Sequence, residues 1–391
     1  MSLQFITGNS GNGKTKYLFN RIVKEAKANP RDNYLVIVPE QFTMQTQRQL
    51  VDLSENKAIM NIDVLSFKRL AYRVFDELGI TNLTVLEETG KNLVLRKLAA
   101  QEADKLGVIG RNLNRIGYIS EVKSLLSELV QYNISPEELG RYIASGRLSD
   151  ALSDKLKDVL VLYEAFEKFM QDKYITAEEI LNVLCNVAEE SAILRNSVIA
   201  FDEFTGFTPI QNQLIKKLFV ISKKIYVTLT IDCREDIFKS RGMQELFDMP
   251  KRTVKSLTEM AAFYGIEVEE PIILDKNYRL AENEELSFME QQLFRKRRCS
   301  FKKVPKHIHI DCLRDPKQEL TKIARRINEL VRNENLRYRD IAIVTGDVNI
   351  YAGYVREIFD KYNIPYFIDA TQEILFHPVS YTHLRAHETT L

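Results

Sequence analysis

The sequence has little net charge, few cysteines and no long apolar run. Its 55 Lys and Arg balance 54 Asp and Glu over 391 residues, so the net charge of +1 indicates no class of partner, and nucleic-acid binding would need a local basic face. The cysteines lack CxxC or other ligand-like spacing and are typical of reduced thiols in a cytosolic protein: Cys185, Cys233, Cys299 and Cys312. No stretch approaches roughly eighteen apolar residues, and no signal pattern opens the chain. We therefore expect a cytoplasmic protein without a membrane partner.

Continuous apolar runs predict strands of a buried parallel sheet. Residues 3–7 and 33–40 form two such runs on either side of a predicted helix at 15–28, which is the order that opens an α/β sheet. The same pattern returns at 196–204 and 223–232. With 45% hydrophobic residues and this length, we expect a globular α/β protein of two or three domains.

Helical periodicity dominates residues 66–190, between those two pairs of strands. Residues 121–131 place apolar side chains at the spacing of one helical face. Residues 134–143 begin another helix, with Ser135 as its N-cap and Pro136 at its first position. We interpret this region as a helical insertion in the sheet domain.

A further unit is predicted after a basic stretch at 294–307. Residues 307–313 and 340–346 have strand-like patterns, and residues 319–333 are predicted to be helical. We expect the domain boundary between 294 and 306. The basic stretch could follow a nucleic-acid backbone or could be a solvated linker, and the sequence favours neither: Arg295, Lys296, Arg297, Arg298, Lys302, Lys303 and Lys306.

A glycine-rich loop near the start of the chain predicts nucleotide binding. It fits G-x-x-x-x-G-K-[ST] at every specified position: Gly8, Asn9, Ser10, Gly11, Asn12, Gly13, Lys14 and Thr15. Such glycines let backbone N–H groups turn towards phosphate oxygens, and the following helix adds its positive end. Lys14 would reach the β- and γ-phosphates of ATP, and the Thr15 hydroxyl would ligate Mg²⁺. The alternative is a chance glycine turn, which would not explain the strand before it and the helix after it.

Hydrolysis needs further groups, because binding alone does not establish it. Asp202 and Glu203 follow a predicted strand, where parallel sheets place their ligand chemistry. Asp202 would hold Mg²⁺ through water and Glu203 would act as general base, whereas the alternative is an ordinary acidic turn. Arg279 is a candidate for the positive charge near the γ-phosphate, although an arginine in a charged segment is more often solvated.

The last residues look foreign to the protein. Residues 379–389, VSYTHLRAHET, match one translated frame of a common transposase sequencing adapter, and the alternative is a natural polar tail. We expect residues 379–391 to be an adapter artefact. His383 and His387 would then not belong to the natural protein, which would continue beyond residue 378.

Several motifs in order resemble the N-terminal part of the AddB family, the B subunits of the bacterial AddAB ATP-dependent helicase/deoxyribonucleases. The loop segment 5–18 opens the chain as in that family, and 35–50 (LVIVPEQFTMQTQRQL) resembles its second helicase-like motif. Residues 63–75 resemble the next block of UvrD-like helicases, and 90–98 resemble the start of the helical insertion. Residues 201–218 resemble the family's strand-end block. The resemblance extends towards a second motor-like domain in two more segments: 338–369 and 374–378.

The resemblance implies a P-loop NTPase fold of the UvrD-like helicase type, with a RecA-like parallel sheet, a large helical insertion and the start of a second RecA-like domain. The division that it implies runs in order along the chain: 1–80, first part of the P-loop domain; 81–190, helical insertion; 191–293, remainder of the RecA-like domain; 294–306, basic linker; 307–378, truncated start of the second domain; 379–391, adapter artefact.

The resemblance also implies a role in repairing double-strand DNA breaks for homologous recombination. In this family AddA is the heterodimer partner that drives translocation and unwinding of DNA ends. AddB supplies a helicase-like scaffold that recognises a hotspot sequence in the exposed single strand. A nuclease domain with a cysteine-held iron–sulfur cluster is expected only in a C-terminal region absent here, so the four cysteines of this chain are not its ligands.

Three features depart from the pattern of related sequences. The strand before the loop begins at residue 3, which leaves no room for the glutamine segment with which UvrD-like motors read adenine. Glu203 stands where the AddB family commonly has glycine, so the chain resembles a motor more closely there, and Gly346 stands where related sequences often have arginine. We therefore expect ATP binding and no translocation by this subunit. We expect little ATPase activity of the fragment alone, because its second motor-like domain is cut off shortly after it begins. Two alternatives stay open: a structural subunit that recognises single-stranded DNA and does not turn over ATP, and an autonomous P-loop ATPase or kinase.

Overall fold

The computed structural model describes the chain outside six segments: 82–83, 109–115, 146–147, 171–173, 296–298 and 370–391. The chain divides into two compact units, residues 1–300 and residues 301–391. Each unit has hydrophobic side chains clustered in cores of its own. The expected adapter-derived tail, 379–391, lies outside the described residues.

The first unit is built on a parallel sheet. Its strands are β1 (Ser2–Gly8), β2 (Tyr34–Ile37), β3 (Ile62–Leu65), β6 (Val198–Phe201), β7 (Lys224–Thr230), β8 (Glu267–Val268) and β9 (Ile272–Leu274). They lie in the order β3-β2-β6-β7-β1-β8, and β9 also pairs with β1. Because β1 pairs with β7, and β7 with β6, in parallel register, the carboxyl ends of these three strands meet at one edge of the sheet. The predicted α/β class and its buried parallel strands are thus confirmed.

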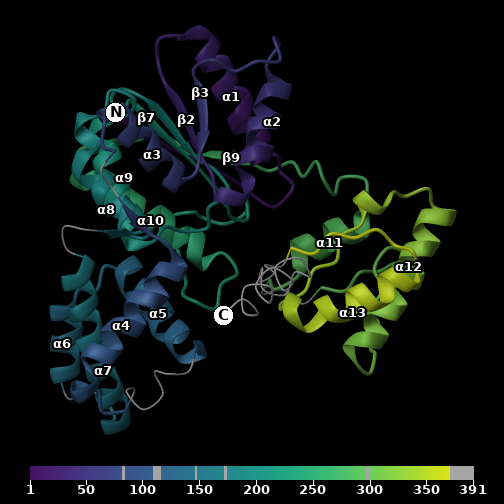
Figure 1. Cartoon of the computed structure of the whole chain (residues 1–391). Coiled ribbons are helices and arrows are strands. Elements are labelled where there is room, and N and C mark those ends of the chain that lie inside the picture. The colour runs from purple at the N-terminus through teal and green to yellow at the C-terminus, as the bar shows by residue number, and fades with distance from the viewer. Residues whose placement is uncertain (82–83, 109–115, 146–147, 171–173, 296–298, 370–391) are drawn as a thin grey trace, which may run out of the picture. The chain divides into compact units, whose positions relative to one another are not determined.

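Helices cover both faces of this sheet (Figure 1). They are α1 (Lys14–Ala28), α2 (Thr43–Leu53), α3 (Phe67–Leu78), α8 (Ile180–Val187), α9 (Pro209–Ile221) and α10 (Asp248–Phe263), and α11 (Glu284–Gln292) follows β9. Successive residues of a strand point to opposite faces, so Leu35 and Ile37 of β2 pack with α3, α8, α9 and α10, whereas Tyr34 and Val36 pack with α1 and α2. The short run of β2 is therefore apolar at every position.

A group of helices between β3 and β6 has a hydrophobic core distinct from the two faces of the sheet. Its elements are β4 (Val85–Leu86), α4 (Glu88–Gln101), α5 (Ile116–Gln131), α6 (Pro136–Ala144), α7 (Asp150–Met170) and β5 (Ile175–Thr176). The start of α6 confirms the sequence-based prediction, because the Ser135 hydroxyl accepts the Glu138 N–H and Pro136 is the first helical residue. Lys91 is buried in this group and pairs with Glu178 at 2.7 Å between Nζ and Oε2.

The second unit contains α12 (Pro316–Asn333) and α13 (Val348–Lys361), which pack on each other through a small core. The helix predicted at 319–333 is confirmed by α12. The strands predicted at 307–313 and 340–346 are wrong, because both segments lack strand pairing among the described residues. A strand needs a hydrogen-bonded neighbour, and Ile310 and Val344 are instead 93% and 94% exposed.

Candidate functional site

The glycine loop joins β1 to α1 at the edge of the sheet where the strands end. Gly11 and Gly13 have φ angles of +89° and +78°, in the left-handed region that side chains disfavour. Gly13 is the N-cap of α1, and it provides no side-chain cap for the helix. The first backbone N–H groups of α1 therefore remain available to an anion.

A cleft of about 710 Å³ lies over this loop. It brings together Lys14, which the sequence assigns to phosphate binding, and all the residues to which the sequence assigns catalytic or metal-binding roles: Thr15, Asp202, Glu203 and Arg279. Among the loop residues, Ser10, Gly11 and Gly13 also line the cleft. Asn9 and Asn12 are buried behind it, at 4% and 2% exposure, so they support the loop from within. Gly8 packs against the backbone of Leu274: a Cβ atom at Gly8 would lie only 2.5 Å from the Leu274 carbonyl oxygen, so the position has no room for a side chain.

Lys14 is half-buried and bonds to the loop itself. Its Nζ donates to the carbonyl oxygens of Gly8, at 3.1 Å, and Asn9, at 3.0 Å. Burial lowers the pKa of Lys14, and the nearby carboxylates of Glu203 and Asp202 act in the opposite direction. The ammonium group is therefore already placed inside the curl of the loop.

Asp202 occupies a buried position at the end of β6 and is 1% exposed. Its Oδ1 accepts hydrogen bonds from the hydroxyls of Thr228 and, at 3.3 Å, Thr15. Within the described part of the chain, its Oδ2 is buried and has no hydrogen-bond partner. Burial raises the pKa of Asp202, and the Thr228 hydrogen bond opposes this rise. An oxygen that lacks a partner in such a place suits a cation or a water bound to one.

Glu203 adopts φ of +64°, which is rare for a residue with a side chain. Its Oε1 accepts a hydrogen bond from the Thr15 hydroxyl at 3.3 Å. Thr15 thus contacts both acidic residues, and the three side chains offer only oxygen ligands, which suit Mg²⁺. Among the described residues no group of three or more His, Cys, Asp or Glu could hold a metal by itself.

The segment that contains Arg279 is fastened to the loop. Asn277 donates its side-chain N–H to the Ser10 carbonyl at 3.0 Å, and the backbone N–H of Tyr278 donates to the Gly11 carbonyl at 3.0 Å. Arg279 follows directly and lines the cleft. Arg279 is exposed, and the contacts of its neighbours with the loop place its backbone beside the cleft.

Sequence reasoning missed three residues of this site. Thr228 supports Asp202 from the buried part of β7, and the sequence does not distinguish it from Thr230 in the same strand. Asn277 and Tyr278 contact the loop from more than 260 positions away, and no local pattern marks them.

The described residues of the basic stretch differ in their surroundings. Arg295 is only 12% exposed and pairs with Asp232, with 2.9 Å between Nε and Oδ2. Lys302, Lys303 and Lys306 are exposed. The remaining three basic residues lie outside the described residues: Lys296, Arg297 and Arg298. All four cysteines are free thiols, and in the described chain no helix is long and apolar enough to cross a membrane.

Comparison with known proteins identifies a family. The model of the family "ADDB, N-terminal" matches residues 5–290, which include the loop, the acidic pair and Arg279. The B subunit of the ATP-dependent helicase/deoxyribonuclease of Lachnoclostridium phytofermentans is 38% identical over 384 residues, which are 97% of this chain and 33% of the relative. The proteins of the same name from Clostridium tetani and Clostridioides difficile are each 33% identical, over 95% and 97% of this chain and 33% of their own length. The chain therefore spans about a third of the length of these curated relatives.

Proposed function

The chain belongs to the family of AddB N-terminal regions, and on this premise we propose that it is the nucleotide-binding, helicase-like part of a DNA-processing subunit. The observation that carries the proposal is the cleft where a glycine loop, Lys14 and the buried Asp202 meet at the carboxyl edge of a parallel sheet. The fold that suits this arrangement is a P-loop NTPase of the UvrD-like type with a RecA-like sheet. Its loop leads from β1 into α1, as phosphate loops do.

Each group in the cleft has a part in ATP chemistry. The loop N–H groups and the start of α1 bind the β- and γ-phosphates, and Lys14 adds a positive charge. Thr15 and Asp202 hold Mg²⁺, which neutralises charge on the phosphates. Glu203 orients the attacking water and accepts its proton, and Arg279 stabilises negative charge at the γ-phosphate.

On the basis of this family, we also propose how the chain divides into domains. Residues 81–190 are a helical insertion between 1–80 and 191–293. Within it, α4 to α7 build a core apart from the sheet, and α8 near its end packs back on the sheet. Residues 294–306 are a basic linker, and 307–378 begin a second helicase-like domain. The nuclease domain and its iron–sulfur cluster belong to the part of the relatives that this chain does not cover.

In the cell, we propose, the complete protein acts in the cytoplasm as a heterodimer with an AddA subunit. The relatives bear the name of the B subunit of an ATP-dependent helicase/deoxyribonuclease. The complex processes double-strand ends for homologous recombination, and the protein to which this chain belongs recognises a hotspot in the single strand and does not translocate along it. Because the site has Lys14, Thr15 and Glu203, it contains the side chains that ATP hydrolysis needs.

A second candidate is a structural subunit whose loop has no turnover. It is favoured by the bonds of Lys14 to the loop carbonyls of Gly8 and Asn9, which stabilise the loop without a ligand. In this interpretation the cleft stabilises the fold, and single-stranded DNA is recognised elsewhere.

The experiment that separates the two candidates uses the full-length protein in complex with AddA. Lys14→Ala is compared with Lys24→Ala, an exposed lysine on the same helix. The first candidate predicts that Lys14→Ala reduces ATP turnover or unwinding by the complex and that Lys24→Ala does not. Unchanged turnover and unwinding, together with a preserved response to the DNA sequence, would support the structural candidate.

A further inference from the structure

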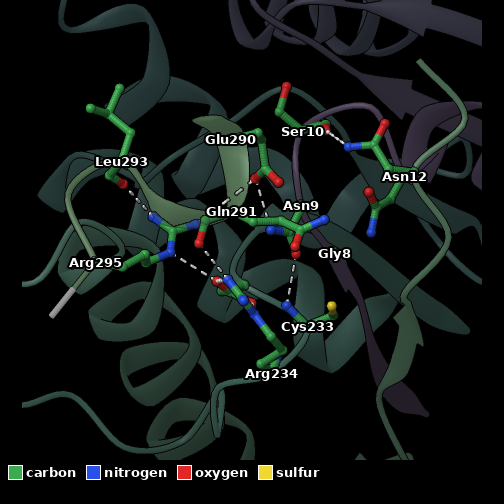
Figure 2. A network of polar contacts seen from close by, with 12 residues as sticks. Gly8, Asn9, Ser10, Asn12, Cys233, Arg234, Glu290, Gln291, Leu293 and Arg295 are labelled. Atoms are coloured by element: carbon green, nitrogen blue, oxygen red, sulfur yellow. Dashed lines mark hydrogen bonds and ion pairs between the residues drawn. The ribbon is translucent and has the colours of Figure 1, made fainter. Parts of the chain in front are cut away.

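A buried polar network connects the second residue of the glycine loop to α11 (Figure 2). The Asn9 side chain uses both ends of its amide: its Nδ2 donates to Glu290 Oε1 at 2.8 Å, and its Oδ1 accepts the backbone N–H of Cys233 at 2.9 Å. Asn9 is 4% exposed, and the Glu290 side chain is 18% exposed. The loop is therefore held by two elements that are far from it in sequence.

Glu290 is in turn held by the residues that follow α11. The guanidinium of Arg295 lies 3.9 Å from Glu290 Oε1, donates to Asp232 Oδ2 at 2.9 Å and stacks 4.8 Å from the ring centre of Phe247. Asp232 is 2% exposed at the side chain and also accepts a bidentate pair of hydrogen bonds from Arg234. Burial works against its charge, but the hydrogen bonds from Arg234 and Arg295 lower the pKa of Asp232. The anchor of Arg295 therefore stays charged.

We propose that Glu290 is a positioning residue of the phosphate-binding loop, acting through Asn9 and kept in place by Arg295. The proposal rests on the proposed nucleotide binding at the loop. Glu290 does not line the cleft, so it has no direct contact with a bound nucleotide. Its carboxylate fixes the side chain of Asn9, and with it the backbone curl that presents N–H groups to phosphate.

The contact also couples the loop to the end of the first unit. The chain passes from Glu290 to Arg295 and on to the second unit, which begins at residue 301. A ligand that orders the loop strengthens the docking of residues 290–295, and by reciprocity this docking strengthens ligand binding. Nucleotide occupancy thus affects residues 290–295 at the end of α11.

The test exchanges the donor and the acceptor of the Asn9–Glu290 contact in the full chain. Asn9→Asp places two carboxylates in contact and is expected to weaken the affinity for a non-hydrolysable ATP analogue with Mg²⁺ about tenfold. Adding Glu290→Gln supplies a new N–H donor and is expected to restore most of that loss. Glu290→Ala alone is expected to weaken binding to a similar extent, and Glu282→Ala, an exposed glutamate before α11, is the matched control with no effect.

Hydrogen exchange without nucleotide provides a second readout that does not depend on binding. Amides of residues 9–13 are expected to exchange about tenfold faster in Glu290→Ala and in Asn9→Asp, and to recover in the double variant. If Glu290→Gln does not rescue Asn9→Asp, or if Glu290→Ala leaves loop exchange unchanged, the proposal is overturned. If the unsubstituted chain binds no nucleotide, the proposed function fails, and the exchange data still decide whether Glu290 positions the loop.

Discussion

Replacing Gly11 with alanine tests whether the segment around Arg279 is packed on the loop. A Cβ at Gly11 would lie 2.8 Å from Asn277 Oδ1 and 2.9 Å from Arg279 Cβ, closer than real contacts allow. The φ of +89° adds a backbone strain of about 1–2 kcal/mol for alanine. Relief of the clash moves residues 277–279 and breaks the bonds from Asn277 and Tyr278 to the loop, at about 1 kcal/mol each.

The total expected for Gly11→Ala is therefore about 3–4 kcal/mol of unfolding free energy. Gly79→Ala is a matched control, because Gly79 has φ of +68° but a Cβ there would meet nothing within 4 Å. It should cost only the strain, about 1–2 kcal/mol. The two variants are compared by urea unfolding followed by far-ultraviolet circular dichroism, with ATP affinity measured in parallel. If Gly11→Ala is no less stable than Gly79→Ala, the segment does not pack on the loop as described.

Three further predictions concern single side chains. Thr228→Val removes a hydrogen bond to the buried Asp202 and should weaken Mg²⁺-dependent ATP affinity about tenfold, as measured by Mg²⁺ titration. Thr228→Ser keeps the hydroxyl and should retain the affinity, so an equal loss in both variants would contradict this role of Thr228. Burial lowers the pKa of Lys14, and only the charged form of its side chain attracts phosphate. ATP affinity should therefore be constant at pH values below that pKa and fall as pH rises through it. The Lys14→Arg variant should bind ATP independently of pH over the same range. Lys91→Met leaves the carboxylate of Glu178 without its ammonium partner and should lower the unfolding free energy by about 3–5 kcal/mol, as measured by thermal or urea unfolding. The double variant with Glu178→Met should recover part of this loss. A single variant as stable as the unsubstituted chain would refute the role of this ion pair.

The parts of the fold that could be predicted are those with a local signal. The strands β1, β2, β6 and β7 are buried at nearly every position because both faces of the sheet are covered, and each contains a run of mainly apolar residues that the sequence shows. Pro136 after Ser135 marks a helix start on its own. The segments 307–313 and 340–346 show the limit of this signal. Alternating or apolar residues describe a strand only when a neighbouring strand completes its hydrogen bonds, and the described residues supply none there.

The candidate site divides in the same way. The glycine loop was visible because its residues are contiguous, and Asp202 because it follows a buried strand. Glu290 and Thr228 act through contacts with residues about 281 and 26 positions away, which only the folded chain brings together. The left-handed backbone conformation of Glu203 is likewise a property of the turn, and it could not be predicted from the residue type.

The central claim is that the loop of residues 8–15 binds a nucleoside triphosphate. Calorimetric titration of the full chain with ATP and Mg²⁺ tests it directly, with Lys14→Ala as the disabling variant and Lys24→Ala as the control on the same helix. We predict saturable binding at one site in the unsubstituted chain and in Lys24→Ala, and its loss in Lys14→Ala. Absence of saturable binding in the unsubstituted chain, or binding that survives Lys14→Ala unchanged, would contradict the claim.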